Sequence, residues 1–509
     1  MCDIFISPDL KGVGMLSFDA ESVSRITQSG YEAASAQEEE FKALKERIFV
    51  NGDEVRRIDT AYKQRALNIL DERVLISGIE LVGVEKDIER WVRRKCTVQV
   101  GDSICKADID QSVSIYYGTG NYESVTYTLH KDTSSPEGFI LRFTFVESPP
   151  HDFGLGFRFD SQDMLSLLLR LGVNSNSMSG FKADLSTKLG GNQWLQANVS
   201  YGRLLSPRIN LGYHFRNSEI DAYDMDELVM NMKFLQHKFR FYLSENYSRT
   251  ISVGAGLEAE FLHPRKVMYS LYDAVESDYQ TVNTLGSFAY LHYDNLNKSS
   301  FATRGSKDGI DFTWRDMTFT SKSTEPLGIA SVVYGLESYV PVIEDRLVLI
   351  PQLYGSFLFG PGSVNGTSES WNPMFHGPVP CYPSMNNMLG GAEMGRYIDH
   401  HLPFIGLNNI SLAFNNLAIG RLDIRTRLFK KHYLTLLLNY GRSGVDMKSF
   451  VGKSESLLWG ELYGYNASNS WGVGLRYSID TKMGPLNFDI SSSNISRNVN
   501  LYFSLGYYF

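Results

Sequence analysis

From residue 151 to the last residue, apolar and polar positions alternate strictly in short runs. The stretch "FGLGFRFD" at 153–160 places its four apolar side chains on one face, and "SVGAGLEAEF" at 252–261 repeats the pattern. Glycines and the charged residues Glu258 and Glu260 occupy the opposite face, and the final "LYFSLGYYF" at 501–509 still alternates. Because successive side chains of a strand point to opposite faces, these runs predict β-strands.

The polar face indicates which solvent surrounds the strands. Glu258 and Glu260 would be costly in a dry core, whereas a water-filled lumen accommodates them. At about 10 residues per strand plus turns, residues 151–509 accommodate about 16 strands. The pattern therefore predicts a mainly β fold, a transmembrane antiparallel β-barrel with an apolar exterior, whose last strand closes against the strand at 153–160. A large soluble β-protein is the alternative.

Composition agrees with many strands joined by tight turns. The 509 residues are 43% hydrophobic and 13% aromatic, with 44 Gly and 16 Pro. No apolar run reaches the roughly 18 residues of a membrane-spanning helix. The net charge of -8 argues against a nucleic-acid partner.

The start, "MCDIFISPDL", lacks the basic and apolar regions of a signal peptide. We therefore expect the chain to begin inside a longer architecture.

Two segments precede the barrel. Residues 1–72 are charged and helical in pattern, and Asp19 is a candidate N-cap of a helix that Gly30 is expected to close. Residues 73–150 alternate between strand and helix patterns in the order β-α-α-β-β, with Ile88, Trp91 and Val92 on one helix face. Such an order buries one helical layer on one small sheet.

The 73–150 segment resembles a POTRA (polypeptide-transport-associated) domain, in part through the turn at 118–122, "GTGNY". The resemblance implies a small α+β domain whose sheet edge accepts an extended polypeptide strand.

A stretch after the longest loop, "NMLGGAEMGRYIDHHLPFIGL", resembles a loop of the outer-membrane superfamily that includes barrel-assembly factors and two-partner-secretion transporters. In that family a Gly-Gly pair precedes an Arg-Gly-aromatic tip that folds into the barrel lumen; here the Gly precedes the Arg. The aspartate usual on the strand "LLLNYGRSG" is missing. The resemblance implies an inward-loop lock formed by Gly390, Gly391, Gly395, Arg396, Tyr397 and the wall carboxylate Asp423.

Three further features are similar to the same superfamily. "DNLNKSSFATRGSKDG" matches its mid-barrel strand connection, with Ala302 replacing a proline, and "GVGLRYSIDTKMGPLNFDI" matches its penultimate hairpin. The terminal Phe509 resembles the aromatic signal that the outer-membrane barrel-assembly machinery recognises.

The first 35 residues resemble the tail of a patatin-like phospholipase, through "SPDL", "SF" and a helix ending in Gly-Tyr. Patatin, POTRA and barrel together are the layout of patatin-like outer-membrane autotransporters. Those enzymes place their serine in a G-x-S-x-G elbow, and this chain contains none. The resemblance therefore implies a serine hydrolase upstream of Met1, and we expect no catalytic residue in this chain.

Neither a cofactor nor a metal site is expected. Asp399, His400 and His401 are adjacent, but neighbouring residues of an extended stretch point apart and converge poorly on one ion. The four cysteines lack metal-like spacing. Cys96 and Cys105 could pair in an oxidising compartment, but we expect two unrelated buried thiols.

The leading hypothesis is an anchor and translocator for a patatin-like phospholipase domain. The barrel would lie in a Gram-negative outer membrane, with the POTRA domain and N-terminus in the periplasm. Expected partners are outer-membrane lipid, the barrel-assembly machinery and a polypeptide strand at the POTRA edge. The alternatives are an assembly or secretion factor acting on other polypeptides, a diffusion porin and an active phospholipase on this chain.

Overall fold

The structure is a computed structural model of the 509-residue chain. It describes residues 20–42, 73–84, 86–119, 121–132, 138–174, 180–202, 207–246, 250–269, 282–319, 324–344, 346–360, 371–372, 377–378, 387–391, 399–407, 410–413, 415–444, 446–452 and 467–507. Within these residues no helix is long and apolar enough to cross a membrane.

The N-terminal helix α1 (Ala20–Ser35) continues past the predicted stop. Gly30 does not have the positive φ of a glycine that ends a helix, so the predicted end at Gly30 is wrong. A single interior glycine costs a helix about 1 kcal/mol, and the following Tyr-Glu-Ala-Ala stretch continues the helix. Asp19, the predicted N-cap, lies outside the described residues.

A small mixed module follows, with the predicted order of strands and helices and one additional two-residue strand. Its elements are β1 (Val74–Val82), α4 (Lys86–Lys95), β2 (Ser103–Ile104), α5 (Lys106–Gly118), β3 (Tyr122–Lys131) and β4 (Gly138–Glu147). The sheet order is β2-β1-β4-β3, so β3 forms one edge.

Aromatic packing forms the core of this module. Tyr116 from α5 lies with its ring centroid 5.6 Å from that of Phe143 and 5.1 Å from that of Phe145, both on β4. The Tyr116 hydroxyl donates a hydrogen bond to the Val92 carbonyl oxygen at 3.1 Å. Burial raises the pKa of Tyr116, so the phenol stays neutral and keeps this donor. Ile88 and Val92 are buried, as predicted for their helix face.

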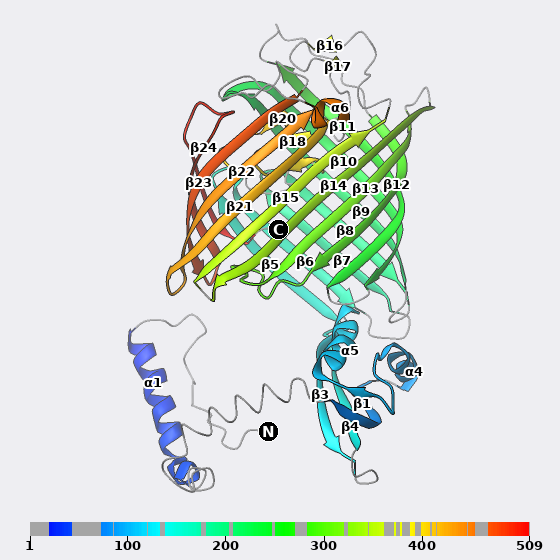
Figure 1. Cartoon of the computed structure of the whole chain (residues 1–509), viewed down its shortest axis with the longest axis vertical. Helices are drawn as coiled ribbons and strands as arrows, with labels where there is room; N and C mark the ends of the chain where they lie inside the picture. Colours follow the sequence, from blue (N-terminus) through cyan, green and yellow to red (C-terminus); the bar gives the residue numbers. More distant parts are fainter. Residues whose placement is uncertain are drawn as a thin grey trace. The chain divides into compact units, whose positions relative to one another are not determined.

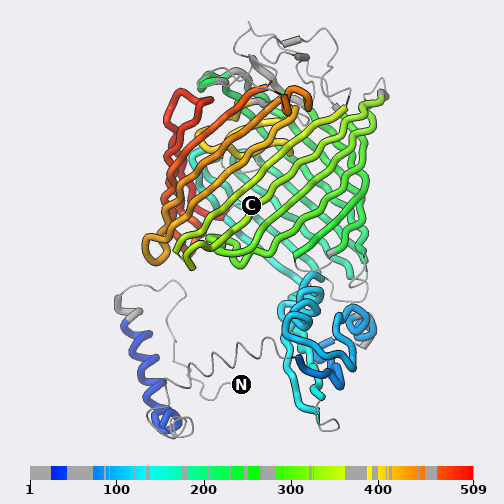
Figure 2. The backbone as a smooth tube through the Cα atoms, viewed as in Figure 1, coloured from blue at the N-terminus to red at the C-terminus, as the bar shows by residue number. Residues whose placement is uncertain are grey.

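Sixteen antiparallel strands form one closed barrel, which confirms the predicted fold class and strand number (Figure 1). They are β5 (His151–Asp160), β6 (Met164–Asn174), β7 (Lys182–Gly190), β8 (Gln193–Tyr201), β9 (Arg208–Asp224), β10 (Glu227–Asn246), β11 (Ile251–Tyr269), β12 (Val282–Asp294), β13 (Gly305–Phe319), β14 (Thr324–Ile343), β15 (Leu347–Phe359), β21 (Asn416–Phe429), β22 (His432–Gly444), β23 (Ala467–Thr481), β24 (Gly484–Ser493) and β25 (Asn500–Gly506). Figure 2 allows the chain to be followed by colour from cyan β5 to red β25.

Alternating burial along the strands gives the barrel an apolar outside and a polar inside. On β11 Leu257 is 59% exposed while its neighbour Glu258 is 4% exposed, and on β25 Leu501 is 68% exposed while Tyr502 is 5% exposed. This is the inverse of a soluble sandwich, and it is the arrangement that the sequence pattern predicted.

Short elements occupy the connection between β15 and β21. They are β16 (Trp371–Asn372), β17 (Gly377–Pro378), β18 (Asn387–Leu389), β19 (His401–Leu402) and β20 (Ser411–Ala413), and β18 pairs with both β19 and β20. After β22 comes the short helix α6 (Met447–Val451), capped by Asp446, whose side chain accepts a hydrogen bond from the Ser449 amide at 2.6 Å. This hydrogen bond lowers the pKa of Asp446.

Candidate functional site: the seam and the lumenal segment

The barrel closes between its last strand, β25, and its first, β5, and this closure, here termed the seam, is short within the described residues. Among the described residues, three pairs join the two strands: Ser504 with Asp160, Leu505 with Phe159 and Gly506 with Arg158. On either side, β24 and β25 share six pairs, and β5 and β6 share ten. Within the described residues, the seam therefore has the fewest paired residues of the junctions in this part of the wall.

Side chains add a small number of contacts across the seam. On the inside, Arg158 donates a hydrogen bond across the seam to the Tyr502 hydroxyl at 2.7 Å, and it also donates to Asp160 on its own strand at 2.8 Å. On the outside, the rings of Phe159 and Phe503 meet at a centroid distance of 5.8 Å. The amide of Ser161 donates to the Phe503 carbonyl oxygen at 3.0 Å. Both faces of the seam thus carry specific contacts.

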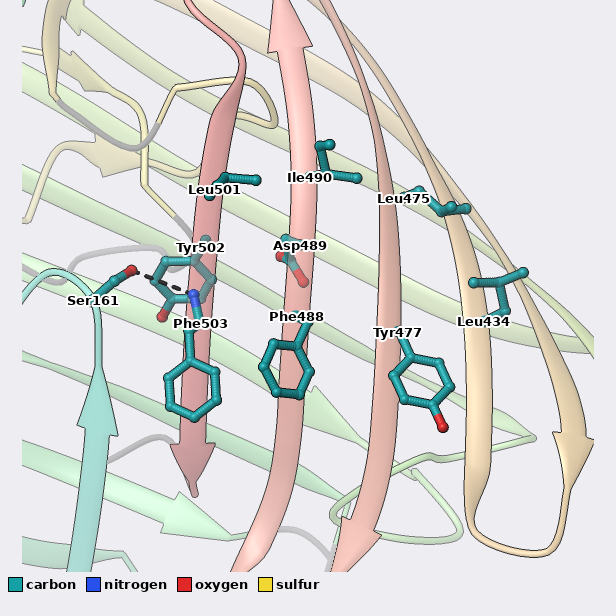
Figure 3. Close-up of a pocket in the computed structure, with 10 residues that line it drawn as sticks. All are labelled: Ser161, Leu434, Leu475, Tyr477, Phe488, Asp489, Ile490, Leu501, Tyr502 and Phe503. Carbon is teal, nitrogen blue, oxygen red and sulfur yellow. Dashed lines mark hydrogen bonds between the residues drawn. The ribbon is translucent and has the colours of Figure 1, made fainter.

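An apolar depression of about 490 Å³ lies on the barrel wall beside the seam. Figure 3 shows Leu501, Ile490 and Leu475 side by side on three adjacent strands, with the rings of Phe503 and Phe488 next to each other in a second row. Because Leu501, Ile490 and Leu475 are exposed, the depression lies on the outer face and suits contact with hydrocarbon.

The described part of residues 387–413, here termed the lumenal segment, packs inside the barrel through an apolar cluster; it comprises residues 387–391, 399–407 and 410–413. The segment contributes Met388, Leu389, Leu402, Phe404, Leu407 and Ile410, and the inner wall contributes Ile220, Ala222, Met232, Phe234, Leu262, Tyr354, Leu417 and Ile419, joined by Ile495. This is a dry core within an otherwise polar lumen, and it fixes the segment in place.

Glycines on the inner wall make room for part of this segment. A Cβ added to Gly472 on β23 would collide with the Ile405 carbonyl oxygen, and one added to Gly474 would lie 3.0 Å from the Ile405 side chain. On β22, a Cβ at Gly441 would lie 3.1 Å from the Phe404 ring. These three positions, here termed the glycine groove, let the backbone of the segment approach the wall closely.

Hydrogen bonds hold the segment in the groove. The Ile405 amide donates to Asn439 at 3.2 Å, and the Gly406 carbonyl oxygen accepts from Ser493 at 2.9 Å and from Asn500 at 2.7 Å. Gly406 itself has a φ of 89°, where a side chain would be strained. The last two strands of the barrel are therefore bonded directly to the lumenal segment.

A charged cluster attaches the segment to the other side of the lumen. The Lys238 ammonium group on β10 forms an ion pair with Asp399 and lies 3.7 Å from Glu258. Glu258 also pairs with Arg240 at 2.7 Å. Lys238 is 3% and Glu258 4% exposed, so both charges depend on their partners.

The two histidines beside Asp399 have separate partners. The His400 ring lies 2.9 Å from the Ser356 hydroxyl on β15, and the His401 ring lies 2.6 Å from the Gly390 carbonyl oxygen. The three adjacent side chains thus diverge to three different places, as their extended spacing suggested. Within the described residues no group of His, Cys, Asp and Glu is arranged to hold a metal ion.

The predicted inward-loop lock is only partly within the described residues. Gly390 and Gly391 have φ values of 132° and 70°, which accommodates the sharp turn expected there. Asp423 faces the lumen, 4% exposed, and accepts hydrogen bonds from Arg421 at 2.7 Å and Gln352 at 3.1 Å. Gly395, Arg396, Tyr397 and Phe509 lie outside the described residues.

Sequence reasoning missed the roles of Lys238, the glycine groove and the rim residue Asp226 described below. The alternation of "WGVGLRYS" placed Gly472 and Gly474 on the inner face, but it did not show which part of the chain these glycines contact. Cys96 and Cys105 are not joined by a disulfide, and both are half-buried rather than buried as predicted.

The part of the chain that holds the glycine groove and the last five strands is similar to a known family. Residues 380–509 match the OMP85 superfamily. This confirms the predicted superfamily resemblance over those residues, and it does not bear on the predicted patatin-like parent. No curated protein matches the chain in sequence.

Two solved structures show a similar fold. BamA from Haemophilus ducreyi lacking POTRA domains 1–3 is 14% identical, over 85% of this chain and 84% of that chain, with a TM-score of 0.52. CdiB from Escherichia coli is 12% identical, over 85% of this chain and 76% of that chain, with a TM-score of 0.50. At these identities the similarity is one of fold.

Proposed function

We propose that this protein is an outer-membrane barrel of a Gram-negative bacterium that inserts or secretes other polypeptides, using the seam between β5 and β25. The observation that carries the proposal is that, among the described residues, three pairs close a barrel whose other strands are extensively paired. The OMP85 match over residues 380–509 supports the same function class, which is the predicted alternative rather than the predicted lipase anchor.

The wall has the chemistry that a membrane requires. Its outer face exposes large apolar side chains from many strands, among them Phe153, Leu211, Phe241, Leu291 and Ile490. A closed barrel satisfies every ladder hydrogen bond internally, and apolar outward residues replace water with lipid. Outer-membrane lipid is thus the proposed surrounding partner.

The seam offers a polypeptide substrate unpaired backbone. Residues 151–157 of β5 have no pair on β25 within the described residues, although they pair with β6 on their other side. An extended segment adds readily to such an edge through main-chain hydrogen bonds. An incoming strand would extend the sheet while its apolar side chains face lipid.

We propose that residues 73–150 act as a POTRA domain that delivers such segments. The sheet order leaves β3 at an edge, where an extended chain can add as another strand. The patatin-like parent is still a prediction from the first 35 residues.

Locking the seam covalently is expected to abolish insertion. The outward-facing partners Phe159 and Leu505 are directly paired, and directly paired residues of an antiparallel ladder have the spacing of a disulfide. We expect the Phe159→Cys/Leu505→Cys chain, with its four native cysteines changed to serine, to lose accelerated insertion of a urea-unfolded eight-stranded outer-membrane barrel into liposomes. Reduction should restore the activity.

The matched control is the pair Leu291→Cys/Ile310→Cys, which joins β12 and β13 on the same apolar face. Its oxidation should leave insertion unchanged. Full activity of the oxidised seam pair would refute the proposed function.

We also propose that Arg396 locks the lumenal segment, as the superfamily resemblance implies. Arg396→Ala is then expected to raise cleavage of residues 387–413 by externally added protease several-fold, because the loop loses its charged anchor. Lys430→Ala, in the exposed turn between β21 and β22, is the control. Equal protection of the two variants would contradict the lock.

A further inference from the structure

The tip of the β9–β10 hairpin is bonded to the turn between β24 and β25. The Asp226 carboxylate accepts hydrogen bonds from the Ser496 hydroxyl at 2.9 Å, the Arg497 amide at 2.6 Å and the Asn498 amide at 3.1 Å. The Asn498 side-chain amide donates to it as well, at 3.1 Å. A single carboxylate thus receives four donors from residues about 270 positions further along the chain.

The backbone of the hairpin tip is built to present this carboxylate. Asp224 pairs with Glu227, and the two residues between them, Met225 and Asp226, have φ values of 47° and 70°. Two consecutive positive φ values are those of a type I′ turn. Methionine rarely adopts such a value, so surrounding contacts must hold it there.

This contact bridges the seam. In the barrel order, β5, β6, β7 and β8 separate β25 from β9. Those four strands have only 10, 11, 9 and 9 residues, whereas β9 has 17 and β10 has 20. The long hairpin therefore reaches across the strands beside the seam to the turn on the seam's other side.

Buried contacts near Asp226 join the β9–β10 hairpin, the β24–β25 turn and the lumenal segment. Ile495 in the β24–β25 turn is 2% exposed and packs in one cluster with Ile220 and Ala222 of β9 and Ile410 of the lumenal segment. The Tyr223 amide donates to the Ile410 carbonyl oxygen at 2.7 Å. The hairpin, the turn and the lumenal segment are thus packed together at the rim.

We propose that Asp226 and its four donors, here termed the rim clasp, restrain opening of the seam. This inference rests on the proposed function, because it takes the seam as the site where a polypeptide substrate enters. With the clasp formed, the turn that leads into β25 is held to the β9–β10 hairpin, in addition to the three described pairs between β25 and β5. When the clasp releases, β25 loses this restraint, and the seam pairs and the bonds of Ser493 and Asn500 to Gly406 are what still hold the last hairpin.

Hydrogen exchange measures the open population of the seam directly. The test uses the full chain in lipid nanodiscs, where the exchange rate of a strand amide follows its opening equilibrium. Asp226→Asn removes the charge that strengthens four hydrogen bonds. We expect amides of β5 and β25 to exchange about tenfold faster or more, while those of β12 and β13 keep their rate.

Two further variants make the test specific. Glu227→Gln removes the exposed ion pair of Glu227 with Arg497, 3.3 Å long, and should leave seam exchange unchanged. Ser496→Ala removes one donor, should accelerate seam exchange by a smaller factor, and serves if Asp226→Asn fails to fold.

Unchanged seam exchange in a folded Asp226→Asn chain would overturn the proposal, as would equal acceleration of every strand. Exchange requires no substrate, so the outcome is separate from the insertion assay. Accelerated seam exchange together with an active oxidised seam pair would support the clasp and refute the proposed function.

Discussion

Gly472→Ala is expected to displace the lumenal segment from the inner wall. The added methyl carbon would lie 2.0 Å from the Ile405 carbonyl oxygen, and a backbone atom cannot turn aside as a side chain does. Overpacking of this kind destabilises a packed structure by about 1–3 kcal/mol. At this site we expect the cost to weaken docking of the lumenal segment more than pairing of the strands. Protease cleavage within residues 387–413 should rise at least several-fold, and single-channel conductance in planar bilayers should increase.

Gly420→Ala is the matched control for this change. Gly420 is a strand glycine on β21, and a Cβ added there meets no atom within 4 Å. The control should keep both the protection and the conductance of the unmodified chain. If Gly472→Ala behaves like the control, the glycine groove does not position the segment.

Replacing Lys238 with methionine is expected to have the largest effect on stability. The side chain is 3% exposed, and its loss leaves Asp399 without its ion pair and Glu258 with Arg240 alone. Removing one partner of a buried pair destabilises by about 3–5 kcal/mol. Because Asp399 is one-third exposed, we expect a loss near about 3 kcal/mol, measured by urea unfolding followed by heat-modifiable migration.

The same strand supplies the control. Lys233 pairs with Glu219 at 2.8 Å, but the two side chains are 46% and 47% exposed. Lys233→Met should therefore lower the free energy of unfolding by at most about 1 kcal/mol. In a double-mutant cycle, Asp399→Asn should recover part of the Lys238→Met loss, because the unpaired charge is removed with it. Equal effects of the two lysine changes would show that the lumenal pair has no special role.

The alternation of side chains was sufficient to predict the barrel, because strand faces follow a local two-residue period. Glu258 and Glu260 illustrate this: their position opposite Leu257 already indicated a wet interior, and both are buried inside the wall. The closure of β25 on β5 also followed, since a closed sheet must join its first and last strands.

The interior could not be predicted in the same way. Met388 and Phe404 are apolar residues of an irregular stretch, and nothing local shows that they pack against Phe234 on β10. The lengths of β9 and β10 also exceeded the expected ten residues, because alternation continues beyond the part of a hairpin that faces lipid. The family motif drew attention to Arg396, whereas the described ion pair of the segment is that of Asp399 with Lys238.

The separation of the clasp partners along the chain has a consequence for the order of folding. Asp226 and Ser496 are 270 residues apart, and Asp160 and Ser504 at the seam are further apart still. Contacts of such separation require the largest loss of chain entropy before they form, so local hairpins precede them. The rim clasp and the seam are therefore expected among the last contacts of the barrel to form, and a folding intermediate with its hairpins complete would still be an open sheet with two free edges.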